Sequence, residues 1–280
     1  MIKADFHMHS AHSEDSDTPM EQQIEAAVEA GLKYICFTEH MDKDWPEDDG
    51  VKKGGAPVGK ALFLLDTETY YKHCMECRDA YKDRIDIRFG VEYGFQPHLS
   101  EHNRKYVSEY PFDFIIGSQH LMNGADVYYP ENFADMTDRE AFHTYFENEL
   151  ESICRFDGYD VFGHLDYIVR YGTNKNRDYF YKDHAEIIDE ILRQLIKRGK
   201  GIEINTAGFR KLGNEPNPST DILRRYHELG GEIITVGSDA HTPGSVAYDF
   251  ARAEKLLLDL GYTYYCIFKD RKPEFISLLK

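Results

Sequence analysis

The chain has 280 residues, 41% of them hydrophobic, and a net charge of −17 at neutral pH. This length suffices for one large α/β domain with a substantial core, and the negative charge repels a phosphate backbone, so we expect no nucleic acid partner. No stretch approaches the roughly 18 apolar residues of a membrane helix, so we expect no membrane segment. Lys3, Asp5 and His7 lie among the first residues, so we expect no secretory signal and a cytoplasmic protein.

Short β-rich segments alternate with amphipathic helical segments, which is typical of an α/β fold with a parallel sheet and crossover helices. The first helix is expected to begin with Thr18 as N-cap and Pro19 at the first helical position, and to end at Gly31. A capping box is predicted from Thr137 to Glu140. Strands are expected at residues 2–7, 34–38, 85–92, 112–118, 160–164, 201–206, 232–238 and 263–268, and further helices at residues 67–81, 137–153, 187–195, 218–229 and 245–260.

No break in composition divides the chain, so residues 1–280 are expected to form a single domain. The longest loop candidate is residues 42–62, which contain Trp45-Pro46 and Gly54-Gly55. Loops of this length often cover a site, but a solvated insertion explains the composition nearly as well, and both interpretations stay open.

The five cysteines are odd in number and scattered along the chain, which favours reduced thiols over a disulfide framework. Cys74-x-x-Cys77 has the spacing of a half zinc site. However, it lies in the expected helix at residues 67–81 and lacks a second cysteine pair, so helix packing explains it better.

Polar or metal-ligating side chains follow seven of the expected strands. The carboxyl ends of the strands in a parallel barrel converge on one face, so these side chains are expected to meet there. Six histidines and several acids in such positions predict a metal cluster, and mixed imidazole and carboxylate donors suit Zn, Mn or Fe better than Ca or Mg. The seven segments are His7-Met8-His9, Thr38-Glu39-His40, Gly90-Val91-Glu92, Gly117-Ser118-Gln119-His120, Gly163-His164-Leu165-Asp166, Glu203-Ile204-Asn205-Thr206 and Gly237-Ser238-Asp239-Ala240-His241.

The order of these motifs resembles that of the polymerase and histidinol phosphatase (PHP) superfamily over nearly the whole chain. Within it, segments such as Gly163-His164-Leu165-Asp166-Tyr167 are most similar to the stand-alone histidinol-phosphate phosphatases. The resemblance implies a distorted (β/α)7 barrel, similar to a TIM barrel, with three divalent metal ions at the C-terminal ends of the strands. Their implied ligands are His7, His9, Glu92 and Asp239 for the first ion, His120 and His164 with bridging Glu92 for the second, and Asp15, His40 and His241 for the third.

Some residues near these motifs have no counterpart in the resemblance. His12 and Glu14 match no ligand position, and Gln119 stands where a small apolar residue is expected. The histidines on the expected helices, which include His73, are given no role.

Metal ions of this kind indicate phosphate ester hydrolysis, because a metal-bound hydroxide can attack phosphorus while the cations neutralise the phosphoryl oxygens. Arg170 and Arg210 follow the fifth and sixth strands and are expected to bind the phosphate, although each alone could equally be solvated or salt-bridged. Asn205 either adds a donor or organises the strand-end turn. The proton for the leaving alkoxide is expected from Asp166 or from a metal-bound water.

The expected function is hydrolysis of the small phosphate monoester L-histidinol phosphate by a monomer or small homo-oligomer. Acidic residues near the mouth (Glu14, Asp17 and Asp42) could select the amine and imidazole of histidinol, although solvated surface charge explains them better. The closest alternative is a phosphatase or phosphodiesterase for another small phosphate ester. An amidohydrolase would need a carboxylated lysine that none of the seven strand ends offers, and a barrel that binds metal without turnover leaves the arginines unexplained.

Overall fold

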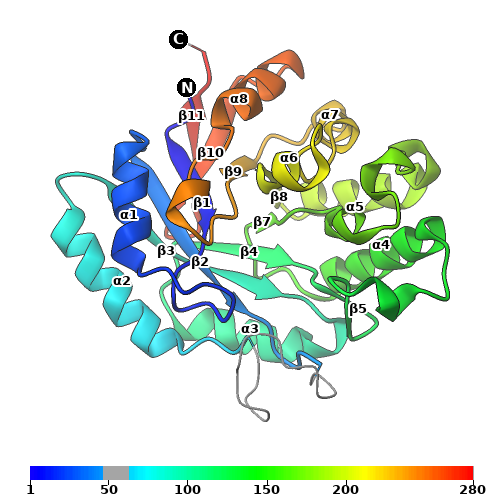
Figure 1. The fold of residues 1–280 in the computed structure, drawn as a ribbon, viewed down its shortest axis with the longest axis horizontal. Helices are drawn as coiled ribbons and strands as arrows, with labels where there is room; N and C mark the ends of the chain where they lie inside the picture. The colour runs from blue at the N-terminus through cyan, green and yellow to red at the C-terminus, as the bar shows by residue number, and fades with distance from the viewer. Residues whose placement is uncertain (47–62, 280) are drawn as a thin grey trace.

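The computed structural model describes residues 1–46 and 63–279, and its central feature is a sheet of seven parallel strands (Figure 1). Every residue of these seven strands except Tyr34, His40 and Asp86 is buried, as a parallel sheet covered on both faces requires. In sheet order the strands are β1 (Ala4–Met8), β2 (Tyr34–Met41), β3 (Asp86–Gly94), β4 (Phe114–Ser118), β7 (Val161–Phe162), β8 (Gly201–Asn205) and β9 (Ile234–Gly237).

The two edges of this sheet approach each other just beyond the strand ends. Met8 forms a parallel bridge with Ala240, and the His9 amide donates to the Ala240 carbonyl at 2.9 Å. The sheet is therefore a nearly closed barrel, and the predicted distorted (β/α)7 architecture is confirmed. The single-domain assignment of residues 1–280 stays a prediction.

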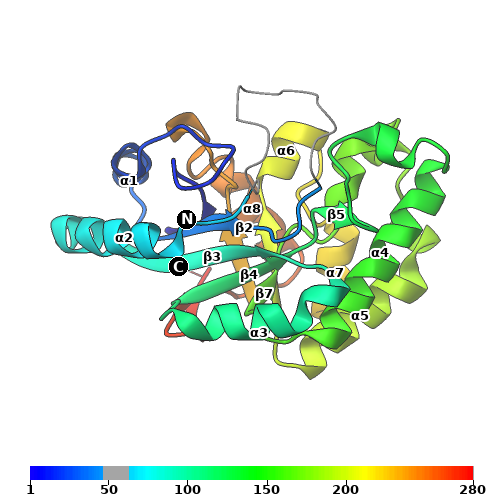
Figure 2. The ribbon, with the colours of Figure 1, turned by 90° about the horizontal axis from the view of Figure 1, so that it is seen from below.

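Eight α-helices in the described ranges surround the barrel, and Figures 1 and 2 show α1 and α2 on one side of it and α4 and α5 on the opposite side. None of the helices described is long and apolar enough to cross a membrane. Their bounds are α1 (Met20–Glu29), α2 (Thr67–Tyr81), α3 (Ser100–Glu109), α4 (Asp138–Arg155), α5 (Ala185–Lys197), α6 (Ala207–Leu212), α7 (Thr220–Glu228) and α8 (Phe250–Asp259). Shorter elements are the hairpin β5 (Leu121–Met122) and β6 (Ala125–Asp126), and the 3₁₀ turns η1 (Pro97–Leu99), η2 (Pro130–Phe133), η3 (Tyr167–Tyr171), η4 (Lys175–Arg177), η5 (Tyr181–Asp183) and η6 (Pro243–Ser245).

The capping signals in the sequence are right for one helix and wrong for another. The box at the start of α4 is complete, because Thr137 and Glu140 satisfy each other's backbone N–H groups. The predicted N-cap of α1 is wrong. Pro19 occupies that position, and the Thr18 hydroxyl instead donates to the His241 carbonyl at 2.8 Å, which joins the loop after β1 to the loop after β9.

The segment expected as an eighth strand lies outside the barrel. It forms β10 (Tyr264–Lys269), which pairs antiparallel with β11 (Lys272–Ser277) and packs against β9. Both residues of the connecting turn, Asp270 and Arg271, have positive φ, as a tight hairpin turn requires. The Arg271 Nε donates to Asp160 Oδ2 at 2.5 Å and thereby fastens the hairpin to the start of β7.

The loop predicted at residues 42–62 falls mostly outside the described residues. Residues 42–46 are described, and Asp42 is 3% exposed, so it belongs to the interior and not to the surface. The remainder of the prediction, residues 47–62, lies outside the described part of the chain.

The closure of the barrel depends on a glycine at the end of β9. A Cβ atom on Gly237 would lie 2.3 Å from the Cβ of His7 and 2.9 Å from Glu203 Oε2. Since real Cβ atoms do not approach others so closely, only glycine lets β9 lie against the end of β1.

We predict that Gly237→Ala lowers the free energy of unfolding by about 1–3 kcal/mol, because the added methyl group has to displace His7 or its neighbours. Urea unfolding followed by circular dichroism measures the change. The matched control is Gly244→Ala, whose added Cβ has no neighbour within 4 Å. Equal stabilities of the two variants would contradict this account of barrel closure.

Candidate metal centre

The strand ends bring the metal-ligand candidates of the sequence together on one face of the barrel. At the middle of this cluster the carboxylate of Glu92, fully buried at the end of β3, lies between imidazoles from four other strand ends. The Glu92 oxygens lie 3.2 Å from His7 Nε2, 3.0 Å from His40 Nδ1, 3.2 Å from His120 Nε2 and 2.8 Å from His164 Nε2.

The remaining candidates adjoin this group. The His9 ring is stacked between those of His40 and His241, with centroid distances of 4.3 and 4.2 Å. Asp15 Oδ2 lies 3.5 Å from His40 Nε2 and 3.1 Å from His241 Nε2. Asp239 Oδ1 lies 3.8 Å from His7 Nε2 and 3.7 Å from His9 Nε2.

Four overlapping sets of these side chains have one donor atom each within 4.8 Å of the others, a spacing that a metal ion could bridge. Since the sets share members, the division of the nine residues among individual ions stays a prediction. The sets are His7/His9/Glu92, His7/His164/Asp239, His9/His40/His241 and His40/Glu92/His120.

Three of the histidines are held from behind by acceptor groups. His7 Nδ1 lies 2.9 Å from Glu203 Oε2, and His120 Nδ1 lies 2.7 Å from Asp42 Oδ1. Because a carboxylate only accepts, each Nδ1 carries a proton, and in the neutral ring that can bind a metal the lone pair is on Nε2, toward the cluster. This arrangement is the usual support of a metal-ligating histidine.

The third support runs through a serine. His9 Nδ1 lies 3.1 Å from Ser13 Oγ, which itself donates to Glu39 Oε2 at 2.6 Å. Glu39 also accepts from the Ser10 amide and hydroxyl. Glu39 therefore accepts hydrogen bonds from serines and does not face the cluster. Of the pair Glu39-His40, only His40 contributes a side chain to the cluster.

The donor atoms that face the cluster include several with no hydrogen-bond partner among the described residues. An unpaired buried polar atom costs free energy, and a cluster of them pointing at one another is typical of a cation-binding site. The donor chemistry also fits, since imidazole and carboxylate together suit Zn, Fe or Mn. These atoms are His7 Nε2, His9 Nε2, His40 Nδ1, Glu92 Oε2 and His241 Nε2.

The electrostatics of the cluster likewise favour positive charge. Burial disfavours the charged form of His7, but Glu203 and Glu92 outweigh burial and raise its pKa well above the usual value. Burial would raise the pKa of Glu92, but His7, His40 and His120 hold it well below its usual range. Burial and the neighbouring histidines lower the pKa of His9, which keeps this ring neutral, as a ligand must be. Divalent cations would compete with these protons for the same imidazole and carboxylate groups.

Arg170 reaches this cluster through a buried network. Its Nη1 donates to Asp239 Oδ2 at 3.2 Å and its Nη2 to Asn205 Oδ1 at 3.1 Å. Its Nε donates to Asn217 Oδ1 at 2.7 Å, and the Asn217 amide group donates to Asp166 Oδ1 at 2.6 Å. Asn217, to which sequence analysis gave no role, therefore fixes the orientation of the guanidinium.

Two of the predicted site residues serve this network. Asn205 is fully buried, and its Nδ2 donates to Glu203 and Asp239 at 3.1 and 3.3 Å, so it organises the strand end. Asp166 is 1% exposed, and its second oxygen accepts from the Ser219 amide at 2.8 Å. Burial raises the pKa of Asp166 to about 6 against the effect of these hydrogen bonds.

Arg210 is less constrained than Arg170. It lies in α6, its guanidinium covers the Tyr248 ring at 4.9 Å, and its Nη1 is buried without a hydrogen-bond partner in the described structure. An arginine with a free donor is available to bind an anion. Of the acidic residues considered for substrate selection, Glu14 and Asp17 are exposed, whereas Asp42 is the buried partner of His120.

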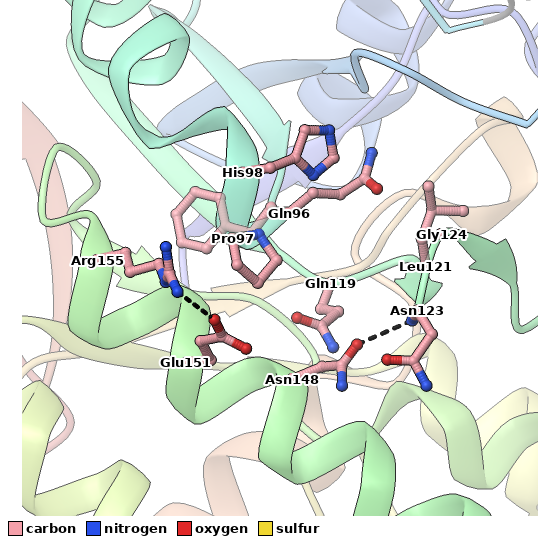
Figure 3. Close-up of a pocket in the computed structure, with 11 residues that line it drawn as sticks. Gln96, Pro97, His98, Gln119, Leu121, Asn123, Gly124, Asn148, Glu151 and Arg155 are labelled. Atoms are coloured by element: carbon pink, nitrogen blue, oxygen red, sulfur yellow. Dashed lines mark hydrogen bonds and ion pairs between the residues drawn. The ribbon is translucent and has the colours of Figure 1, made fainter.

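Gln119, the residue that departs from the expected pattern, points away from the cluster. Its Nε2 donates to the Tyr145 carbonyl and its Oε1 accepts from Ser152, so it ties β4 to α4. It also lines a cavity of about 370 Å³ between η1 and α4, where the Glu151–Arg155 ion pair lies (Figure 3). None of the nine ligand candidates lines this cavity, so it is separate from the cluster.

Comparison with known proteins agrees with this geometry. A family model described as "PHP domain" matches residues 5–207. Histidinol-phosphatase of Lactococcus lactis is 32% identical over 97% of this chain and 96% of its own length, and a probable histidinol-phosphatase of Clostridium acetobutylicum is 32% identical over 90% and 91%.

A crystal structure of the L. lactis histidinol phosphate phosphatase, complexed with Zn, L-histidinol and phosphate, superposes with a TM-score of 0.87 at 31% identity, covering 97% of this chain and 98% of that one. A structure from Listeria monocytogenes, with a TM-score of 0.76 at 20% identity over 89% of this chain and 99% of that one, shares the fold. This chain belongs to the PHP domain family, in its histidinol-phosphatase branch.

Proposed function

We propose that this protein is a metal-dependent phosphomonoesterase that hydrolyses L-histidinol phosphate to L-histidinol and phosphate. The observation that carries the proposal is the cluster of unpaired imidazole and carboxylate donors, with the Arg170 guanidinium bonded to Asp239 at its edge. The likeness to a phosphatase that binds zinc, histidinol and phosphate supports the choice of substrate. We further propose that it acts in the cytoplasm as a monomer or small homo-oligomer, without nucleic acid.

Three divalent ions, of Zn, Fe or Mn, are proposed to occupy the cluster. When bound, such ions lower the pKa of water and neutralise charge on a phosphoryl group. The ligands that we propose are the nine gathered side chains, which are His7, His9, Asp15, His40, Glu92, His120, His164, Asp239 and His241.

The two arginines are proposed to bind those phosphoryl oxygens that the metal ions do not contact. A phosphate dianion matches the forked donors of a guanidinium, and Arg210 has a donor to spare. Arg170 is held by Asn217 and Asn205, so its guanidinium is oriented before the substrate binds. Such orientation removes an entropic cost from binding.

We assign Asp166 a positioning role in place of proton donation. Both of its oxygens accept hydrogen bonds, from Asn217 and from the Ser219 amide, and it is almost fully buried. Its effect on the substrate would thus pass through Asn217 and Arg170. Water is then the proton source for the leaving oxygen.

The direct test is a steady-state assay of L-histidinol phosphate beside a phosphodiester and an amide, with Zn²⁺, Mn²⁺ or Fe²⁺ added. We expect turnover of the monoester alone, its loss after treatment with a chelator, and its recovery when metal is restored. Turnover of the diester in preference to the monoester would favour the phosphodiesterase alternative, and turnover that survives complete metal removal would contradict the proposal.

We predict that His9→Asn and Asp239→Asn each abolish hydrolysis while the fold survives, because ligands at the rim of a complete barrel contribute more to metal binding than to packing. Activity assays, metal content and circular dichroism check this. His143→Asn is the control, because His143 lies half-exposed on α4, away from the cluster. Turnover at the wild-type rate in either ligand variant would remove that residue from the proposed set.

The role of Asn217 is tested by a double-mutant cycle on kcat/KM. We predict that Asn217→Ala and Arg170→Ala each lower kcat/KM about tenfold to a hundredfold and that their effects are not additive, because Asn217 acts through Arg170. Arg210→Ala should cause a similar loss, additive with Asn217→Ala. Additive losses for Asn217 and Arg170 would show that Asn217 does not act through that arginine.

A further inference from the structure

A second group of metal-ligating side chains lies outside the strand-end cluster, between α1 and α2. Glu21 of α1 and His73 and Cys77 of α2 each offer a donor atom within 4.8 Å of the others. The two helices lie side by side on the outside of the barrel (Figures 1 and 2). The three residues belong to neither the proposed catalytic ligands nor the arginine network.

The spacing on α2 places two of the donors on one face. Residues four apart in a helix lie above each other, so His73 and Cys77 point in the same direction. Cys77 is only 4% exposed, whereas the side chains of His73 and Glu21 are 31% and 50% exposed. The group therefore has a buried sulfur and an opening toward solvent.

Both ring nitrogens of His73 have a hydrogen-bond partner. Its Nε2 lies 3.0 Å from Glu21 Oε1, and its Nδ1 lies 2.9 Å from His12 Nε2. Because a carboxylate only accepts, Nε2 carries the ring proton when no cation is bound and donates it to Glu21, while Nδ1 accepts from His12. A ligating histidine with its second nitrogen anchored in this way is the usual pattern at metal sites.

The Cys77 thiol stays protonated as long as no cation is bound. Burial raises the pKa of the Cys77 thiol to about 11, and the charges of Glu21 and Glu76 act in the same direction. A divalent cation would interact favourably with both groups and would replace the thiol proton.

We propose that Glu21, His73 and Cys77 form a second, mononuclear site for a zinc-like transition metal ion, with His12 orienting His73. On binding, the Cys77 thiol releases its proton to solvent, while the ring proton of His73 moves from Nε2 to Nδ1 and His12 Nε2 changes from donor to acceptor. A thiolate, an imidazole and a carboxylate select Zn²⁺, Co²⁺ or Ni²⁺ over Ca²⁺ and Mg²⁺. Three protein ligands leave the fourth position to water, on the solvent side.

Sulfur makes this site distinguishable from the catalytic one. The strand-end cluster contains imidazoles and carboxylates, and none of its ligand candidates is a cysteine. The metal-loaded full-length protein is titrated with Co²⁺ while the near-ultraviolet absorption is recorded, where a thiolate bound to Co²⁺ gives a charge-transfer band. This band reports the second site alone, whatever the substrate of the enzyme proves to be.

We expect a band that saturates at one Co²⁺ per chain and is displaced by Zn²⁺. It should disappear in Cys77→Ser, persist in the control Cys154→Ser, whose thiol is exposed on α4, and need at least tenfold more Co²⁺ in His73→Gln. His12→Ala should keep the band but weaken binding about tenfold.

Two results would overturn this proposal. One is the lack of any thiolate band in the wild-type protein at millimolar Co²⁺, and the other is a band that His73→Gln leaves unchanged in affinity. Because His73 is partly exposed, its variant tests the site even if Cys77→Ser does not fold.

Discussion

The attraction between one buried carboxylate and the imidazoles around it organises this molecule. Glu92 is inaccessible to solvent, accepts a hydrogen bond from Ser118 at 2.6 Å and faces ring nitrogens that arrive from four other strand ends. A buried carboxylate surrounded by ring nitrogens needs positive charge nearby, from protons or from metal ions, to compensate for its lost hydration. The barrel, its closing glycine and the acids behind the histidines all serve to keep these donors pointing at each other. The cost of gathering them is consistent with a site built to hold cations.

The global and local charges of the protein differ, and the difference bears on the substrate. With a net charge of −17 the protein as a whole repels a phosphate ester. Arg170 places a positive charge beside Asp239 of the cluster, and bound metal ions would add more. The site thus favours a small ligand that fits entirely within this local field over an extended polyanion that also meets the acidic surface.

Much of the fold and of the cluster could be predicted from the sequence, because both follow from local signals. Strand ends in a parallel barrel share one face, so residues such as His7 and Glu92 could be associated without knowing the loops. Contacts that depend on loop geometry could not be predicted. Asp42 and Asn217 reach His120 and Arg170 from distant segments, and no local pattern marks them. Thr18 shows the same limit, because its hydroxyl bonds to the His241 carbonyl and does not cap the helix as the local signal predicts. The strand β10 shows it too, because it pairs with β11 outside the barrel sheet.

The central claim is that these donors hold several divalent cations at one rim of the barrel. Crystals of the protein equilibrated with Zn²⁺ and measured at the zinc absorption edge would test it most directly. We predict anomalous peaks about 2.0–2.3 Å from histidine nitrogens and carboxylate oxygens of the cluster, with Glu92 between two of them. An anomalous map without a peak among His7, Glu92 and Asp239 at saturating zinc would contradict the claim, and the phosphatase proposal would have to be withdrawn.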